Sequence, residues 1–457
     1  MTEATPIRIL DNPREPSFRP AMDYLIDKRA QQFPDSDDFE RLRVQSKQLK
    51  QAALSNLPAL LEQAEAAMVA NGIQVHWAET IEEAQATIHQ IMLDTQATTM
   101  VKGKSMVSEE IYLNHHLEAH GLRAVETDMG EFIVQLAGET PSHIIMPAIH
   151  KSKEDIAALF QAHLDVPYTL DVDELIAIGR EQLRTEFEQA GIGLSGVNFI
   201  AADTGTLCLV ENEGNGRLST TAPDVHVAIT GIEKVVAHLA DVPKLIRVLT
   251  RSATGQPITT YVNWIHGPRK PEERDGPRAV HLVLLDNGRS QLYQKERQQE
   301  SLQCIRCGAC MNHCPVYTRI GGHAYNTTYP GPIGKILSPH LTSLPDTPDH
   351  PKASTLCGAC HTVCPVGIPI TDLLLDHRAQ ATLPRREQWI WRFWSMFNRH
   401  PRVYRMSLGL MLRLYPLLPK WLGGWTRHRA APALSRQSLG QKMAARPKKG
   451  VQSGAAS

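Results

Sequence analysis

The sequence predicts an α/β domain with a largely parallel sheet, followed by a small helical unit organised around cysteines. From about residue 71 to residue 295, short apolar segments alternate with amphipathic helical segments, which is typical of βαβ units. Between 296 and 380 the chain is rich in Cys, Gly and Pro, and the strand-like segments stop. A chain of 457 residues is also too long for one ordinary domain, so we expect several units.

The segments before, within and after the α/β domain have distinct patterns. Residues 1–70 form an N-terminal helical segment, because charged and apolar residues mix at helical spacing from residue 20 onward. Within 71–295 we expect strands at 72–78, 98–105 and 142–149, helices at 80–94, 108–121 and 171–191, and a hairpin at 197–214. Residues 381–457 form a basic, aromatic C-terminal region that ends in a low-complexity tail, 435–457, expected to be disordered.

The composition is that of an ordinary globular protein, with 42% hydrophobic and 21% charged residues. The amino end has no apolar core of the kind that a secretory signal needs. No uncharged apolar run approaches the roughly 20 residues of a membrane-spanning helix. We therefore expect a cytoplasmic protein.

Charge is spread unevenly along a chain whose net charge is zero. From Arg385 to the end there are fifteen Lys or Arg residues and one acid, Glu387. Five of the seven tryptophans lie between Trp389 and Trp425, interleaved with arginines. This mixture suits a surface at 385–429 that packs on the ferredoxin unit or on a partner subunit, or that lies peripherally on the inner face of the cell membrane. No nucleic-acid-binding motif accompanies the charge, so we expect no nucleic-acid partner.

Seven of the eight cysteines are concentrated in two motifs, a spacing that indicates metal ligation rather than disulfides. The first motif, C-x2-C-x2-C-x3-C-P, consists of Cys304, Cys307, Cys310, Cys314 and Pro315. This is the spacing of bacterial-type ferredoxins. The second motif repeats it through Cys357, Cys360, Cys364 and Pro365, with Ser354 where the first cysteine would stand.

The ferredoxin cross-over rule assigns these thiols to two 4Fe–4S clusters. Cluster 1 takes Cys304, Cys307, Cys310 and Cys364, and cluster 2 takes Cys314, Cys357 and Cys360. Cluster 2 is one thiolate short, so it has either a different fourth ligand, such as Ser354 or water, or is a 3Fe–4S cluster. Zinc is disfavoured, because three cysteines in C-x2-C-x2-C cannot all bind one tetrahedral ion comfortably. The long spacing between the motifs and the helical patches beside them favour a helical ferredoxin arrangement.

Several other patterns are weaker. Residues 191–196 match G-x-G-x-x-G, but they follow a helix and enter a strand, the reverse of a dinucleotide fingerprint, so we interpret them as a loop. Gly334-Lys335 lacks the remaining residues of a phosphate-binding loop. His116 and His120 have metal-ligand spacing but no evident third ligand, which favours a solvated helix face. Lone Cys208 is expected to be a small buried side chain.

Two polar segments in the α/β domain, 126–131 and 211–217, carry acids, amides and glycines beside expected strand ends. They predict either a substrate or partner pocket or ordinary turns, and both interpretations stay open. No activated Ser, Cys or Lys nucleophile is recognisable, so covalent hydrolysis is not supported. No catalytic residue can be named.

Many collinear segments resemble the lactate utilisation protein B family, an iron–sulfur protein family with a LUD domain. The resemblance is carried by KSM at 104–106, SEE at 108–110, ETDMGE at 126–131, SHIIMPAIH at 142–150, ADTGTLCLVENEGNGR at 202–217, GIEKV at 231–235, HGPR at 266–269, DGP at 275–277, DNGR at 286–289, both cysteine motifs and the YPGPIGKILSP between them.

This resemblance implies a LUD domain of NagB/RpiA/CoA-transferase type fused to a ferredoxin unit. It further implies two 4Fe–4S clusters, with four cysteines on one and three on the other, and a role with two partner subunits in oxidising L-lactate to pyruvate. The leading hypothesis is an electron-transfer subunit of that complex. One alternative is a 2-hydroxy-acid dehydrogenase subunit that binds substrate in its own LUD domain; another is a cluster-bearing scaffold or redox sensor without turnover. Which subunit binds lactate is left open.

Overall fold

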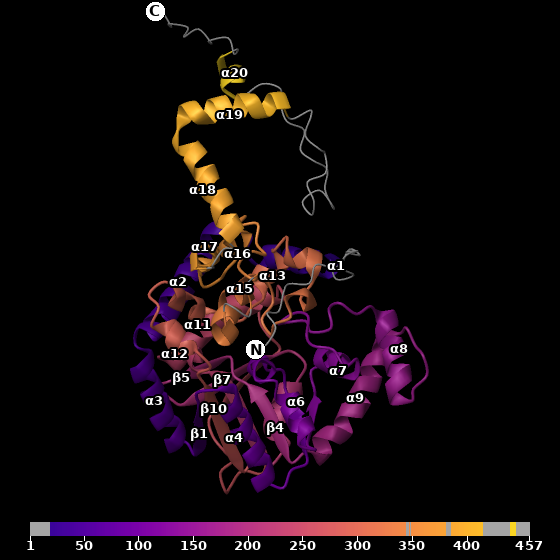
Figure 1. The fold of residues 1–457 in the computed structure, drawn as a ribbon. Coiled ribbons are helices and arrows are strands. Elements are labelled where there is room, and N and C mark those ends of the chain that lie inside the picture. Colours follow the sequence, from indigo (N-terminus) through magenta and orange to yellow (C-terminus); the bar gives the residue numbers. More distant parts are fainter. Residues whose placement is uncertain (1–18, 344–346, 348, 381–384, 415–438, 445–457) are drawn as a thin grey trace, which may run out of the picture. The chain divides into compact units, whose positions relative to one another are not determined.

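The computed structural model describes residues 19–343, 347, 349–380, 385–414 and 439–444 (Figure 1). The described residues fall into two compact units that divide after residue 381. The first unit contains both the α/β domain and the cysteine motifs. The boundary that the sequence places near residue 295 stays a prediction.

A six-stranded sheet, parallel in every pairing, organises the first unit. Its strand order is β1-β10-β7-β4-β2-β3. The strands are β1 (Ile73–Ala78), β2 (Thr99–Lys102), β3 (Arg123–Glu126), β4 (Ile192–Gly196), β7 (Val225–Gly231) and β10 (Ala279–Leu285). The expected α/β domain with a parallel sheet is confirmed.

Both faces of this sheet are covered, which explains why its central strands are rich in apolar residues. Alternate residues of β10 enter opposite cores: Leu282 and Leu284 face one, and Val283 and Leu285 face the other. Helices α4 (Ile81–Asp94) and α6 (Leu113–Ala119) cover one face. The other core holds α1 (Arg19–Gln32), α2 (Ser36–Ser55), α3 (Leu57–Ala70) and α11 (Val242–Ala253), so the expected N-terminal helices are confirmed.

A smaller four-stranded sheet lies in the same core and contains the expected hairpin. Its order is β8 (Val235–Val236), β5 (Phe199–Ala201), β6 (Thr206–Glu211) and β9 (Tyr261–Ile265), with β5 and β6 antiparallel. Cys208 lies in β6 with 1% exposure, and burial raises the pKa of its thiol to about 12. Its expected role as a small buried side chain is confirmed.

The G-x-G-x-x-G segment is mostly strand β4, so it forms no phosphate-binding turn before a helix. A Cβ on Gly193 would lie 1.7 Å from the carbonyl oxygen of Ser219 in α10 (Asn215–Thr221). The missing side chain therefore lets α10 approach the sheet. The rejection of a nucleotide site here is consistent with this packing.

Two sequence-based expectations in this domain are wrong. The helix expected at 108–121 is two short helices, α5 (Met106–Glu110) and α6, because Tyr112 adopts a left-handed conformation with φ 49°. The strand expected at 142–149 is a series of bends and turns. The amides of Ile145 and Met146 both donate to Nδ1 of His143 at 3.1 Å, so they do not join a sheet.

Helices α7 (Met129–Leu136), α8 (Lys153–Leu164) and α9 (Val172–Gln189) pack around a separate small core that includes Phe132 and Phe160 (Figure 1). The predicted helix at 171–191 is α9. It begins where Asp171 accepts hydrogen bonds from the amides of Asp173 and Glu174.

The cysteine-rich segment is helical, and the described residues from 296 to 380 contain no strand. Its α-helices are α13 (Ala309–Asn312), α14 (Tyr317–Ile320), α15 (Gly331–Ser338), α16 (Ala359–Thr362) and α17 (Ile370–Gln380), preceded by α12 (Arg289–Tyr293). The patches expected to be helical beside the motifs are α15 and α17.

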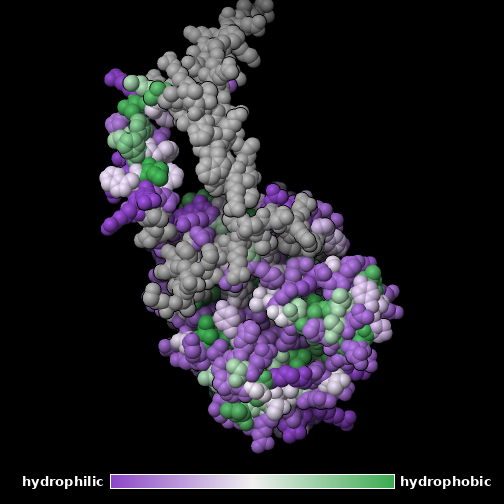
Figure 2. Space-filling model, turned by 45° about the vertical axis from the view of Figure 1, so that its right-hand side comes forward, coloured by the Kyte–Doolittle hydropathy of each residue, from purple (hydrophilic) through white to green (hydrophobic). Residues whose placement is uncertain are grey.

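The second unit contains α18 (Arg385–Arg399), α19 (Pro401–Leu414) and α20 (Leu439–Ala444). No residue of α18 is buried, and Trp389, Trp391 and Trp394 are all at least half exposed. Apolar and charged side chains are mixed on the surface of these helices (Figure 2). Residues 439–444 of the tail expected to be disordered are helical, and the rest of that tail lies outside the described residues. None of the described helices is both long and apolar enough to cross a membrane.

Candidate iron–sulfur centre

The two cysteine motifs adopt the same backbone conformation. In each, the residue before a C-G-A-C tetrapeptide is left-handed: Arg306 has φ 61° and Leu356 has φ 54°. The glycine inside each tetrapeptide is left-handed as well, with φ 73° at Gly308 and 84° at Gly358, and it begins a short helix. The repeat read from cysteine spacing is therefore also a repeat of conformation.

The thiols gather into two adjoining groups. Burial, followed by the electrostatic effect of neighbouring Cys364 and Cys304, raises the pKa of the Cys307 thiol to about 12. Burial and neighbouring cysteines also raise the pKa of the Cys310 thiol. Burial, then Cys314, raises the pKa of Cys360 to about 11, with Cys357 a further neighbour. All eight cysteines are among the described residues, and none forms a disulfide. Cys310 also has Cys360 as a neighbour, so the two groups adjoin, and the ligand assignment itself stays a prediction.

Backbone amides surround the sulfurs as donors. The amide of Arg306 donates to Cys304 Sγ at 3.4 Å, that of Tyr317 to Cys314 Sγ at 3.5 Å, and that of Ile368 to Cys364 Sγ at 3.4 Å. Crowded, buried thiols resist ionisation by themselves, whereas metal coordination deprotonates them outright. Close thiols, absent disulfides and N–H···S bonds together fit iron–sulfur clusters.

Exposure differs between the motifs. Cys307, Cys310 and Cys314 are buried, whereas Cys357 is exposed. The amide of Ala359 and the side chain of Thr355 hydrogen-bond the Cys357 thiol and lower its pKa.

Ser354, which stands at the missing cysteine position, is engaged locally. Its Oγ accepts the amide of Leu356 at 3.1 Å, and its carbonyl accepts a bond from Arg378. A role for Ser354 as a cluster ligand stays a prediction.

A buried lysine lies beside the thiols assigned to cluster 2. Lys335 is fully buried on α15, with Nζ 3.9 Å from Cys314 Sγ and 5.3 Å from the ring centroid of Tyr325. A Cβ on Gly334 would lie 1.5 Å from the carbonyl oxygen of Tyr329, so the glycine permits this close packing. Gly334-Lys335 therefore forms no phosphate loop but brings a cation to a thiolate.

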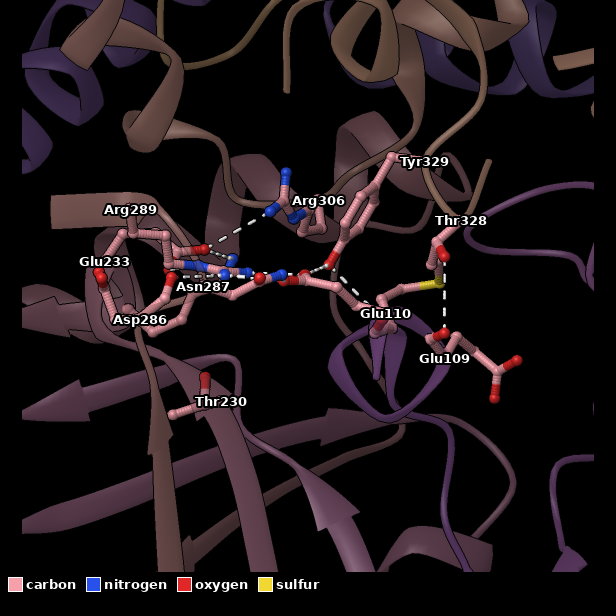
Figure 3. Close-up of polar contacts among 12 residues, drawn as sticks. Glu109, Glu110, Thr230, Glu233, Asp286, Asn287, Arg289, Arg306, Thr328 and Tyr329 are labelled. Carbon is pink, nitrogen blue, oxygen red and sulfur yellow. Dashed lines mark hydrogen bonds and ion pairs between the residues drawn. The ribbon is translucent and has the colours of Figure 1, made fainter. Parts of the chain in front are cut away.

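A buried ionic network lies beside the first motif (Figure 3). Arg289 is 1% exposed and donates from both terminal nitrogens to Glu110, at 2.8 and 2.7 Å, and from Nε to Glu233 at 2.8 Å. The hydroxyl of Tyr329 donates to Glu110 at 2.6 Å, and Asn287 donates to the same carboxylate at 2.7 Å. The negative charges of both buried carboxylates are thus balanced by Arg289, and an unpaired buried charge would be costly.

The network reaches the cluster-1 cysteines directly. Arg306, between Cys304 and Cys307, lies 3.5 Å from Glu233 and stacks 4.3 Å over the Tyr329 ring. Lys234 Nζ donates to the carbonyl of Cys304 at 3.1 Å. The α/β domain therefore holds the first cysteine turn through charged contacts as well as through apolar packing.

Charge in this network is predominantly positive. Burial alone would raise the pKa of Glu233, but Arg289, Lys234 and Arg306 hold it at about 2. Burial and, to a smaller extent, the positive charge of Arg306 lower the pKa of Lys234 to about 8. Burial and then the positive charge of Lys234 lower the pKa of Lys50 to about 7. Lys50 donates to the carbonyl of Glu233 at 2.8 Å.

A cavity of about 700 Å³ lies on the other side of Glu110 and Tyr329. Acidic side chains border it, including Glu109, Glu126 and Glu131. Buried Lys102 pairs with Glu109 at 2.6 Å and with Glu126 at 2.5 Å. The carboxyl group of Glu131 is buried, and burial, then its neighbour Glu126, raises its pKa well above the usual range, which favours its neutral form. Acidic side chains dominate the lining of this cavity.

Comparisons with known proteins agree with this architecture. Family models match residues 61–285 as a LUD domain, 300–368 as a 4Fe–4S dicluster domain and 377–448 as the C-terminal part of lactate utilisation protein B. Lactate utilization protein B of Bacillus subtilis is 44% identical over 78% of this chain and 75% of its own, and that of Macrococcus caseolyticus is 38% identical over 94% of each. The chain belongs to the lactate utilisation protein B family.

Two further matches complete the comparison. The Escherichia coli protein named "Uncharacterized electron transport protein YkgF" is 41% identical over 81% of this chain and 78% of its own. A solved structure of a duf162 family protein from Deinococcus radiodurans covers 50% of this chain and 98% of its own at 13% identity, with a TM-score of 0.29, too low to support an argument.

In this member of the lactate utilisation protein B family, sequence analysis missed the network because its residues are far apart along the chain. Glu110, Glu233 and Arg289 belong to the segments SEE, GIEKV and DNGR. Those segments carry the family resemblance, which was the one indication in the sequence that these residues matter. Nothing local in them indicates that their side chains meet.

The two polar segments of the α/β domain have different roles. Glu126 and Glu131 border the cavity, so the pocket interpretation applies to 126–131. Glu211 accepts the amides of Gly216 and Arg217, both at 2.7 Å, so 211–217 is chiefly a turn. The segments meet where Glu213 accepts the amide of Met129 at 3.1 Å.

Proposed function

We propose that this protein is the iron–sulfur electron-transfer subunit of a complex that oxidises L-lactate to pyruvate. The observation that carries the proposal is the pair of adjoining cysteine groups, built on one repeated turn with amides donating to the sulfurs. Membership of the lactate utilisation protein B family supports the metabolic role. The α/β domain, with its parallel sheet covered on both faces, is consistent with the NagB/RpiA/CoA-transferase fold that the resemblance implies.

The cofactors we propose are two clusters. The first is a 4Fe–4S cluster on Cys304, Cys307, Cys310 and Cys364; the second is held by Cys314, Cys357 and Cys360. Whether the second is 4Fe–4S with a fourth ligand of another kind or 3Fe–4S is decided by the iron count. When bound, such clusters take up and release single electrons.

The protein's own residues would set the conditions for that exchange. Lys234 and Arg306 offset the negative charge of cluster 1, and Lys335 does so beside Cys314. The exposed thiol of Cys357 places the second set of ligands nearest to solvent. Cluster 2 is therefore the side we propose for electron exchange with a partner subunit.

The alternative in which the LUD domain itself binds the 2-hydroxy acid is not favoured. Lactate is an anion, whereas six glutamates line the cavity beside Glu110, and nearby Lys102 is already paired with Glu109 and Glu126. Bringing an unpaired carboxylate into such a site costs free energy because like charges repel in a low dielectric.

Lactate titration of the anaerobically purified protein tests the proposal. We expect cluster reduction, followed by absorbance and electron paramagnetic resonance, only when both partner subunits are present. Reduction by lactate of the isolated chain would support the dehydrogenase alternative instead. If the clusters remain oxidised with partners and lactate present, a scaffold or sensor role replaces electron transfer.

We also propose that 385–429 is the contact surface for a partner subunit. The exposed Trp389, Trp391 and Trp394 on α18 suit a helix that another protein covers, because aromatic side chains dominate such interfaces. Truncation after residue 381 should abolish co-purification with partners while iron content is retained. Flotation of the full chain, but not the truncated one, with anionic vesicles in the absence of partners would favour peripheral membrane contact instead.

A further inference from the structure

Three histidines from two helices converge on one face of the α/β domain. His116 and His120 lie one turn apart on and just after α6, and His89 lies on α4. Their ring centroids are 4.5 to 5.5 Å apart, and one nitrogen of each ring lies within 4.8 Å of the others. The sequence interpretation of His116 and His120 as a solvated face assumed that no third ligand existed. His89 supplies one.

The hydrogen bonds of these rings leave ligand atoms available. His120 Nδ1 lies 2.7 Å from the carbonyl oxygen of His116, so Nδ1–H donates and Nε2 keeps its lone pair. This is the outer hydrogen bond that commonly orients a metal-binding imidazole. His116 Nε2 is buried and has no hydrogen-bond partner in the structure.

The two helices form a firm base for the rings. Ile88 and Met92 of α4 pack in the same core as Leu113 and Leu117 of α6, and all four are fully buried. Gln85 Nε2 on α4 donates to the carbonyl of Ile111, just before α6, at 2.6 Å. Zn–N distances of about 2.0–2.1 Å in a tetrahedral site separate the ligand nitrogens by roughly 3.4 Å, so the three rings would move closer together on this base when an ion binds.

We propose that His89, His116 and His120 form a binding site for a divalent transition-metal ion, with zinc the best suited. Three imidazole ligands without a carboxylate select such an ion over magnesium or calcium, which require oxygen ligands. The fourth position is open to water, as in other three-histidine sites. A bound ion would connect α4 to α6 on the face of the sheet that is opposite the core containing the cluster cysteines.

A second group, Glu139, His150 and His323, does not share these features. His150 uses both ring nitrogens, toward Ser142 at 2.8 Å and Glu139 at 2.7 Å, and His323 bonds the carbonyl of Thr140 at 2.7 Å. Its hydrogen bonds are already made, so it carries no proposal.

Calorimetric titration of the anaerobic, cluster-loaded full chain with zinc chloride tests the site. We expect one equivalent to bind the wild type, and about 10- to 100-fold weaker binding in His89→Ala and in His120→Ala. The matched control is His115→Ala, which removes an exposed neighbouring imidazole from α6 and should bind as the wild type does. Both test residues are at least partly exposed, and wild-type iron content and melting temperature will verify folding.

X-ray absorption at the zinc edge separates this site from the cysteines. Nitrogen scatterers at about 2.0–2.1 Å, without sulfur at about 2.3 Å, are expected. Sulfur coordination would show that zinc had taken the place of iron, and would overturn the proposal. So would the absence of binding to the wild type at about 100 µM zinc, or binding that His89→Ala leaves unchanged.

Discussion

The two cysteine motifs have the same backbone turn but opposite surroundings. The first is enclosed: Cys307 and Cys310 are buried, and Arg306 and Lys234 connect the turn to a charged network in the α/β domain. The second begins at the surface, where Cys357 is exposed, and continues inward to buried Cys360 and Cys364. A repeated turn thus fixes where sulfurs point, whereas the surrounding domain determines their electrostatics and access to solvent.

The largest expected effect comes from removing a ligand of the enclosed motif. Cys304→Ser should lose cluster 1, and with it about half of the iron, while the three-thiolate cluster survives. Electron paramagnetic resonance with iron and sulfide counts measures this. Cys208→Ser, in the β6 core, is the control and should keep both clusters. Equal loss of both clusters in Cys304→Ser would contradict the cross-over assignment.

Breaking the network around the enclosed motif should cost stability. Arg289→Met leaves Glu110 and Glu233 buried without their main partner, which should lower the free energy of unfolding by about 3–5 kcal/mol. Anaerobic denaturant unfolding measures the loss. Arg278→Met, which removes an ion pair with Asp224 in which both side chains are more than half exposed, should change it by less than about 1 kcal/mol. Similar losses in the two variants would show that the network contributes little.

Cluster 2, to which we assign Cys314, is expected to depend on one cation. Lys335→Met removes a positive charge 3.9 Å from Cys314 Sγ and should therefore disfavour the more negative, reduced cluster. At an effective dielectric near 20, the reduction potential should fall by roughly 50–150 mV. A redox titration followed by electron paramagnetic resonance gives the shift. Lys335→Arg should restore most of it, and Lys352→Met, at an exposed site, should leave the potential unchanged. An unaltered reduction potential in Lys335→Met would show that this lysine does not influence the cluster.

The smallest expected effect is a pH dependence at the loop that packs on the first motif. His143 Nδ1 accepts two amides, so Nε2–H donates to Asn312 at 3.0 Å, and burial lowers the pKa of this imidazole to about 4. Because this pKa lies below the unfolded value near 6.5, the stabilisation is complete above pH 6.5 and is lost as the pH falls toward 4.

At pH 5.5 the loss from His143 should be on the order of 1 kcal/mol relative to pH 7.5. Denaturant unfolding at both pH values measures it. His143→Gln should show a correspondingly shallower dependence, since glutamine does not titrate. The same dependence in both proteins would place the acid sensitivity elsewhere.

Local patterns predicted much of the fold because their causes are local. Thr80 caps α4 through the amide of Glu83, as its position before two acids predicts. The apolar segment expected as a strand at 72–78 is strand β1. In contrast, SHIIMPAI has the composition of a strand but is a loop, because Tyr317 of the ferredoxin segment donates to the carbonyl of Ser142 at 2.7 Å and His143 holds the following amides.

The sequence by itself determined the chemistry of this protein: cysteine spacing and left-handed glycines act over a few residues, so the turn, the metal class and the family are readable from the chain. Only the tertiary structure decided what surrounds those thiols. Glu110, Glu233 and Arg289 are brought together by the sheet, and His89 reaches His116 and His120 because two helices share one face. Burial and charge compensation act through space, and no pattern along the chain records them.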